Sequence, residues 1–323
     1  MRRTRVCDLL DIAFPILQGG MLWIATAELA SAVSNAGALG VISPLAGMEK
    51  QGQPAKNFRG QLSKIKQLTP KPFGVNILLD LDYADALMEV VLSEKVKTVI
   101  TAAGNPARFT GVLKSEGVTV LHVVSSVKQA QKAESGGVDG VIAEGIEAGA
   151  HNGADELPLF ALIPQVVDEV SIPVIAAGGI ADARGVVAAF SLGAEGVQLG
   201  TRFVAVNENA AHLNYKQAIV DAQDTDTVIT SRSIVPTRSL KTKFTNTIIE
   251  LERSGAAVED IMEFIGYRSN RTAQLYGNLD GGEAYCGASA GLIKEILPAK
   301  DVVRQLVEGY EHVLKRLSKD PGQ

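Results

Sequence analysis

The chain has 323 residues, of which 46% are hydrophobic, and it carries a formal net charge of −5. This length and composition suffice for one large core, such as the barrel of about 250 residues that eight β/α units form. No basic block exceeds Arg2-Arg3, which argues against a nucleic-acid partner, because phosphate backbones are bound by clustered Lys and Arg.

Targeting and redox signals are weak throughout the sequence. No apolar run approaches the ~20 residues of a membrane span, and the N-terminus lacks the sustained apolar core of a signal peptide. Cys7 and Cys286 lie far apart without metal-ligating neighbours, so we expect two idle thiols rather than a disulfide or a metal site. These observations predict a cytoplasmic protein with no membrane partner.

Short apolar runs recur along the first two hundred residues, and helical patterns lie between them. The helical patterns cover 27–36, 58–68, 84–94, 106–116, 127–135, 159–170 and 183–192. Alternating strands and helices predict a parallel sheet buried on both faces, and eight units predict closure into a (β/α)8 TIM barrel. An open doubly wound sheet is the alternative, but it has no place for all eight runs. The runs begin at Pro15, Ala38, Phe73, Thr98, Thr119, Gly140, Pro173 and Gly196.

The pattern changes after the eighth run. Residues 207–277 predict helices with polar breaks, laid as a cap over one barrel face, and residues 302–317 predict a final amphipathic helix. We therefore divide the chain into a barrel (1–206), a mainly helical cap or substrate domain (207–285), and a C-terminal segment returning to the barrel (286–323). Tyr215, Phe244 and Ile248 either line a site for an apolar chain or, as we favour, form the cap's own core.

Ligands of such barrels bind at the C-terminal ends of the strands. Small and amide residues dominate these ends, which suits a broad planar ligand held by backbone N–H groups. No HExxH, CxxC or close His/Asp cluster predicts a metal. The last two ends are the most specific: Gly178-Gly179 precedes a helix, and Gln198-Leu199-Gly200-Thr201 ends the next strand. Glycines there allow the backbone to approach a phosphate, whose charge the helix N-terminus favours.

Polar residues near these ends carry the candidate chemistry. His151 follows the sixth strand in a loop of small residues, and a histidine can take a proton from a carbon acid or return one. Asn76, on an apolar strand, needs a partner, either a cofactor ring edge or a core neighbour. Glu144 and Glu147 flank the loop and either orient His151, contact a ligand or remain solvated. His122 is interpreted as a core histidine. The leading hypothesis is a phosphate-bearing cofactor with its own chemistry.

Five segments in the right order resemble the nitronate monooxygenases, formerly called 2-nitropropane dioxygenases. They are 15–21, 71–76, 147–151, 177–180 and 198–202. The resemblance implies an FMN-dependent barrel with a helical second domain, and it implies that His151 lies near the flavin as catalytic base or proton donor. Together with the strand-end pattern, it assigns the FMN contacts to Gly20, Met21, Asn76, Glu144, Gly149, Gly178, Gly179, Gln198, Gly200 and Thr201.

The family leaves three activities open. The first expectation is oxidation of an alkyl nitronate with O2 to a carbonyl compound and nitrite. The alternative is reduction of an enoyl-acyl carrier protein thioester or a quinone with NAD(P)H as electron donor. Glu144 and the segments 102–106 and 212–216 look more like the enoyl reductases of the family, and 151–158 looks more like its quinone reductases. A remote alternative is a non-catalytic barrel that binds a phosphorylated metabolite. The expected partners are this small-molecule substrate and, as an assembly, a second copy in a homodimer.

Overall fold

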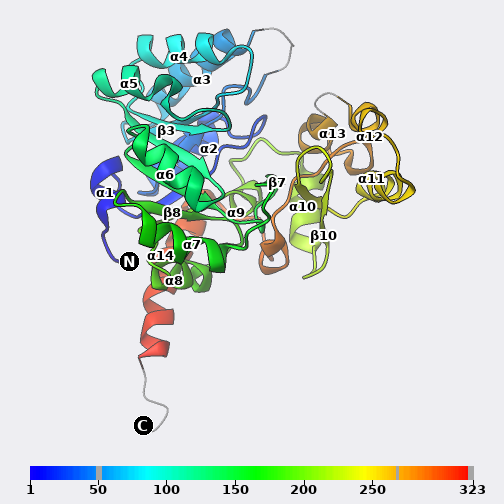
Figure 1. The fold of residues 1–323 in the computed structure, drawn as a ribbon. Helices are drawn as coiled ribbons and strands as arrows, with labels where there is room; N and C mark the ends of the chain where they lie inside the picture. Colours follow the sequence, from blue (N-terminus) through cyan, green and yellow to red (C-terminus); the bar gives the residue numbers. More distant parts are fainter. Residues whose placement is uncertain (49–52, 267–268, 319–323) are drawn as a thin grey trace.

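The computed structural model describes residues 1–48, 53–266 and 269–318. Its main sheet has eight strands in the order β1-β9-β8-β6-β5-β4-β3-β2, and all its pairings are parallel. A parallel bridge between Leu17 and Leu39 brings the two edges of the sheet together, so the barrel nearly closes. The predicted (β/α)8 barrel is confirmed, and it occupies one side of Figure 1.

Each barrel strand lies within one of the eight apolar runs. The strands are Ile16–Gln18 (β1), Gly40–Ile42 (β2), Phe73–Leu78 (β3), Thr98–Ala102 (β4), Thr119–Val124 (β5), Gly140–Glu144 (β6), Val174–Ala177 (β8) and Gly196–Leu199 (β9). The helices around them match the predicted patterns to within a few residues. They are Ala27–Asn35 (α2), Pro54–Leu68 (α3), Ala84–Ser93 (α4), Ala107–Ser115 (α5), Val127–Ser135 (α6), Leu159–Glu169 (α7) and Ala183–Ser191 (α8).

The barrel strands are buried on both faces because two apolar layers meet there. Leu121 and Ile142 belong to the cluster that fills the barrel interior, whereas Val120 belongs to the layer between the strands and the helices. Helix α1 (Arg5–Leu10) joins the interior cluster through Val6 and Leu10. A Cβ at Gly196, which begins β9, would lie 3.3 Å from Val6 Cγ1. Helix α1 therefore closes the N-terminal end, and the opposite end is left for ligands.

The segment after β9 contains the expected helices and one feature that the prediction missed. The short helix α9 (Thr201–Val204) leads to α10 (Leu213–Asp221), α11 (Lys243–Ser254), α12 (Val258–Ile265) and α13 (Ser269–Tyr276). Helices α10 to α13 lie together beside the barrel, whereas α9 stays with the barrel (Figure 1). The prediction of a mainly helical segment missed β10 (Thr227–Thr230) and β11 (Thr237–Leu240), which form a three-stranded sheet with β7 (Ala150–His151). Such short strands carry too few residues to show an alternating pattern.

The apolar residues of this segment pack in two different places. Phe244 and Ile248 of α11 pack with Ile261 of α12 in a small separate cluster, which confirms the favoured interpretation for these two residues. Tyr215 of α10 packs instead with Trp23 and Ile24 from the loop after β1 and lines the cavity at the strand ends, so for Tyr215 that interpretation is wrong. These contacts place the segment against the loops at the C-terminal strand ends. We retain the division at 206/207 and 285/286 as a proposal.

The chain returns to the barrel through an irregular segment and one long helix. Two 3-10 turns, Leu279–Gly281 (η1) and Ala288–Leu292 (η2), precede α14 (Ala299–Leu317). Helix α14, red in Figure 1, packs on α8 and α2. Its Tyr310 ring meets Phe190 edge-on, with 5.6 Å between the centroids. Within the described ranges, no helix combines the length and apolarity needed to cross a bilayer.

Candidate functional site

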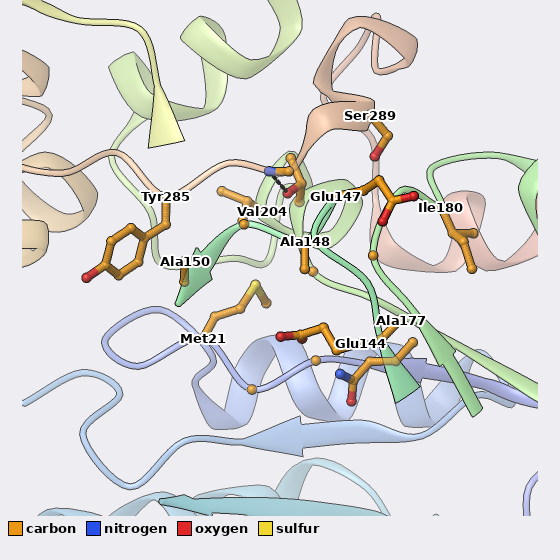
Figure 2. Close-up of a pocket in the computed structure, with 18 of the residues that line it drawn as sticks. Met21, Glu144, Glu147, Ala148, Ala150, Ala177, Ile180, Val204, Tyr285 and Ser289 are labelled. Atoms are coloured by element: carbon orange, nitrogen blue, oxygen red, sulfur yellow. Dashed lines mark hydrogen bonds between the residues drawn. The ribbon is translucent and has the colours of Figure 1, made fainter. Parts of the chain in front are cut away.

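A cavity opens at the C-terminal ends of β1, β6, β8 and β9 (Figure 2). Its inner part is lined by the loops after these strands. A second, larger part of about 720 Å³ continues toward α12 and the β10–β11 connection. The two parts share several wall residues, so they form one continuous site. The shared residues are Gly20, Leu22, Glu144, Gly149, Ala150, Gln198 and Tyr285.

The inner part is shaped by close backbone packing. Gly178 and Gly179 have φ values of +98° and +68°, and a Cβ at Gly178 would lie 2.9 Å from the carbonyl oxygen of Gly145. This loop leads into α8, whose N-cap residue Asp182 accepts a hydrogen bond of 2.8 Å from the Arg184 backbone N–H. Gly200 has open space where a Cβ would be. A phosphate could therefore approach the backbone here, beside a helix N-terminus.

Thr201 and Gly149 tie this part to the C-terminal segment. Thr201 Oγ1 accepts a hydrogen bond of 2.9 Å from the Gly287 backbone N–H. A Cβ at Gly149 would lie 2.8 Å from backbone atoms of Cys286 and Gly287. Both predicted site residues thus line the cavity and also hold the 286–287 backbone against it.

Two predicted amide residues lie across the cavity floor. Gln198 is 9% exposed, and its Oε1 has no hydrogen-bond partner in the described chain. Asn76 Nδ2 donates to the Ile100 carbonyl at 3.3 Å, so a core neighbour satisfies that donor. A Cβ at Gly20 would lie 2.5 Å from Asn76 Oδ1, which explains the glycine. Met21 follows, with its backbone N–H bonded to Ser43 Oγ at 2.9 Å.

The two acidic residues of the histidine loop have different surroundings. Both carboxylate oxygens of Glu147 accept from the backbone N–H of Leu159, at 2.9 Å, where α7 begins. Glu147 therefore anchors a helix rather than orienting His151. Glu144 ends β6, and its side chain points into the cavity (Figure 2). Burial raises the pKa of the Glu144 carboxyl to about 7, because a charged carboxylate is poorly solvated there.

His151 lies on β7, directly opposite Thr237 of β11. Its ring faces Tyr285 edge-on, with 5.7 Å between the ring centroids, and Nε2 lies 3.4 Å from the Tyr285 hydroxyl. Burial lowers the pKa of His151, opposed by the charge of Asp80. The side chain remains accessible from the large part of the cavity. A neutral imidazole is therefore available to a ligand at neutral pH.

Two residues of the site were missed from the sequence, Glu283 and Tyr285. The Tyr285 hydroxyl donates to Glu283 Oε2 at 3.2 Å. Glu283 is only 4% exposed, and burial raises the pKa of its carboxyl to about 7. Both lie in an irregular stretch without helical or strand periodicity. The one available signal was an acid and an aromatic residue placed just before Gly287.

Other polar residues at strand ends have structural partners. His122 is buried, and its Nδ1 lies 2.7 Å from Thr101 Oγ1; burial lowers its pKa to about 4, as expected for a core histidine. Arg202 Nη2 donates to the carbonyl oxygens of Ala205 and Glu295, at 2.7 and 2.9 Å. Cys7 and Cys286 are buried free thiols, as predicted.

The outer wall of the large part is mostly apolar. It is built from the loops after β1 and β2, the end of β3 and the loop that follows it, the connection between β10 and β11, and helix α12. Such a wall binds an apolar ligand by removing its surface from water. Its apolar and aromatic residues are Leu22, Trp23, Leu45, Leu78, Leu81, Tyr83, Ile234, Val235, Met262 and Ile265.

Comparisons with known proteins agree with this architecture. The sequence model of the nitronate monooxygenase family matches residues 3–88 and 83–309. A probable nitronate monooxygenase of Staphylococcus saprophyticus is 34% identical, over 77% of this chain and 81% of that protein. A (3aS,4S,5R,7aS)-5-hydroxy-7a-methyl-1-oxo-octahydro-1H-indene-4-carboxyl-CoA dehydrogenase of Rhodococcus jostii is 36% identical, over 78% of this chain and 69% of that protein.

Solved structures are similar over nearly the whole chain. FabK from Thermotoga maritima superposes with a TM-score of 0.91 at 44% identity, covering 98% of this chain and 99% of that one. Nitroalkane oxidase from Streptomyces ansochromogenes superposes with a TM-score of 0.83 at 26% identity, covering 97% and 99%. The barrel, the ordered motifs and these matches agree, and the chain belongs to the nitronate monooxygenase family.

Proposed function

We propose that this family member is an FMN-dependent reductase that saturates the carbon–carbon double bond of an enoyl thioester with electrons from NADH or NADPH. Family membership makes the chain an oxidoreductase with a flavin cofactor. The proposal adds the identity of the flavin, of the electron donor and of the substrate. Nitronate oxidation was the first expectation from the sequence, and the shape of the cavity now favours the reductase alternative.

The residues of the inner part of the cavity offer groups that suit FMN. The buried Gln198 Oε1 lacks a donor, which costs about 1–3 kcal/mol unless a ligand N–H reaches it. A flavin ring carries such an N–H. The Gly178-Gly179 turn before α8 and the open position at Gly200 suit a phosphate. Bound there, FMN would supply hydride transfer between nicotinamide and substrate.

The size and lining of the outer part carry the proposal. Its volume of about 720 Å³ lies within the range of about 300–1,000 Å³ that pockets for drug-sized ligands have. The predicted flavin contacts Asn76, Glu144 and Gln198 also line this part, so the flavin ring would take some of the space. A small alkyl nitronate would still leave much of the rest unfilled. An acyl chain would fill it, gaining about 0.8 kcal/mol for each buried methylene. The Rhodococcus jostii relative, by its name a dehydrogenase of a CoA thioester, supports a substrate of this class.

Three groups of the chain have distinct roles in this reaction. His151 gives the proton that the substrate α-carbon needs after hydride arrives at the β-carbon. The apolar wall orients the acyl chain and excludes water. Glu144, with a pKa raised to about 7, can donate a hydrogen bond from its protonated form to the cofactor or to the thioester carbonyl.

Nitronate monooxygenation is the second candidate. The small residues Gly149 and Ala150 beside His151 leave space for a compact substrate at the end of the cavity nearest the histidine. His151 would then act in the opposite direction, as the base that deprotonates a nitroalkane. The products would be a carbonyl compound and nitrite.

Parallel assays of the FMN-loaded enzyme distinguish the two. We expect oxidation of NADH or NADPH, followed by absorbance, to depend on trans-2-octenoyl-CoA and to yield octanoyl-CoA. Nitrite release from propyl-2-nitronate in air should be much slower. Fast nitrite release with no octenoyl-dependent oxidation of either nicotinamide would reject the reductase proposal and support the monooxygenase.

A further inference from the structure

The edge of strand β11 brings His151 and Tyr285 together. His151 of β7 pairs with Thr237, and Tyr285 forms an antiparallel bridge with Ser239. Thr237 and Ser239 are two residues apart, so their partners project from the same face of the small sheet. Their rings are therefore neighbours along one edge, as the edge-on contact at 5.7 Å shows.

Backbone bonds fix the position of Tyr285. The Leu240 N–H donates to the Ala284 carbonyl at 2.9 Å, and the Cys286 N–H donates to the Arg238 carbonyl at 3.2 Å. The Tyr215 hydroxyl donates to the carbonyl of Tyr285 itself. Because the residues on both sides are bonded, the Tyr285 ring needs no backbone rearrangement to reach His151.

A continuous series of polar atoms runs from Glu283 to the imidazole. Glu283 Oε2 lies 3.2 Å from the Tyr285 hydroxyl, which lies 3.4 Å from His151 Nε2. The second distance is long for a hydrogen bond, as is common before substrate binds. All three residues line the large part of the cavity. Because Nε2 faces Tyr285, Nδ1 is the ring nitrogen that remains for a ligand.

The surroundings allow Glu283 to hold a proton at neutral pH. Glu283 is 4% exposed, and burial raises the pKa of its carboxyl to about 7, opposed by the Tyr285 hydrogen bond. Burial also raises the pKa of Tyr285 well above its usual value, and the Glu283 charge adds to this effect, so the phenol stays protonated. The charge that opposes the lowering of the His151 pKa is that of Asp80, from the loop after β3.

We propose that Glu283 and Tyr285 form a proton relay that replenishes His151 during reduction of the substrate. The inference rests on the proposed function, because saturating an enoyl thioester consumes one hydride and one proton. As Nδ1–H gives its proton to the α-carbon, Nε2 takes the proton of the Tyr285 hydroxyl. When the Glu283 carboxyl is protonated, it donates to the Tyr285 oxygen, the reverse of the bond that its carboxylate accepts, and Tyr285 takes this proton in turn. One C–H bond forms, the imidazole and phenol remain neutral, and Glu283 is left as a carboxylate that solvent in the cavity reprotonates.

The kinetic test uses the FMN-loaded variants Tyr285→Phe and Glu283→Gln. Flavin reduction by the nicotinamide needs no proton from His151, so its rate should change less than about twofold. Reoxidation of the flavin by trans-2-octenoyl-CoA should slow by about 10- to 100-fold, which is part of the rate enhancement that a general acid provides. The solvent isotope effect on this step should become larger. Equal slowing of both half-reactions, or of neither, would overturn the relay. Tyr310→Phe on α14 and Glu116→Gln after α5 are matched controls.

A second measurement does not depend on turnover. The chain has four histidines, so 15N labelling of their imidazoles gives a readily assigned spectrum. In wild-type holoenzyme the His151 signals should shift as Glu283 titrates near pH 7, and this step should vanish in Glu283→Gln and Tyr285→Phe. An unchanged His151 titration in both would refute the relay. If octenoyl-CoA is not reduced but the titration step of His151 near pH 7 is present, the proposed substrate is wrong while the relay stands.

Discussion

At the scale of single residues, the burial of Glu144 in the cavity makes the free energy of unfolding depend on pH. Its pKa is about 7 in the folded chain against an ordinary value of 4.5. A carboxyl whose pKa is raised by folding binds more protons in the folded state between those two values. The free energy of unfolding therefore falls as the pH rises from 4.5 to about 7 and is level above it. The loss is at most about 3 kcal/mol.

Glu144→Gln should remove this dependence. We expect the flavin-free variant to be more stable than wild type at pH 8, by about 1–3 kcal/mol, and to differ little from it at pH 4.5. Urea unfolding at the two pH values gives both free energies. Parallel pH dependence of the two proteins would show that Glu144 ionises normally.

Gln198 offers a direct test of the cofactor site. Its buried Oε1 has no partner in the described chain, so Gln198→Leu should not destabilise the flavin-free protein. It should weaken FMN binding about 10-fold or more, by removing an acceptor worth about 1–3 kcal/mol. Quenching of FMN fluorescence measures the affinity, with exposed Gln217→Leu as the control. Equal affinity in wild type and Gln198→Leu would place the flavin elsewhere.

Some site residues were predictable and others were not, for a physical reason. Gln198, Asn76 and His151 stand out because they are polar residues at or near the ends of apolar strands. Glu283 and Tyr285 carry no such signal, because their position depends on pairing with β11, some 45 residues earlier in the chain. A long-range pairing of an irregular segment leaves no periodicity to read.

At the scale of elements, the barrel strands were predictable because parallel strands buried on both faces are nearly continuous apolar runs. Strands β10 and β11 have four residues each, and β7 has two. Their register depends on cross-strand contacts rather than on composition. The strand that holds the candidate catalytic histidine was therefore among the elements that sequence patterns could not show.

Gly149→Ala tests how tightly this arrangement is packed. A Cβ there would lie 2.8 Å from the Cys286 and Gly287 backbone, so backbone must shift, at a cost of about 1–3 kcal/mol. We expect lower thermal stability and loss of turnover, because the displaced segment carries Tyr285. Gly111→Ala, on α5 with open space around it, should instead stabilise the protein by up to about 1 kcal/mol. Equal thermal stability of Gly149→Ala and Gly111→Ala in calorimetry would contradict the packing argument.

At the scale of the whole molecule, the cavity is a product of several distant segments. Loops after β1, β3 and β6, the β10–β11 connection and α12 each contribute to its wall. The barrel and a capping segment were foreseeable, but the volume between them depends on how these side chains meet. Substrate size was thus the property that the sequence alone left open.

The cavity predicts a preference for longer acyl chains. Each methylene that enters the apolar wall should contribute up to about 0.8 kcal/mol, so kcat/KM should rise by about two- to fourfold per methylene from butenoyl- to octenoyl-CoA. Steady-state rates across this series measure the slope. A flat series would mean that the acyl chain lies outside the cavity.

Anaerobic stopped-flow absorbance of the FMN-loaded protein tests the proposed reductase most directly. NADH, NADPH and propyl-2-nitronate are mixed with it separately, and the flavin band is followed. We predict rapid bleaching by at least one nicotinamide, and rapid recovery of the band when trans-2-octenoyl-CoA is added in a second mix. Slow reduction by both nicotinamides together with rapid reduction by the nitronate would contradict the account and make the chain a nitronate monooxygenase.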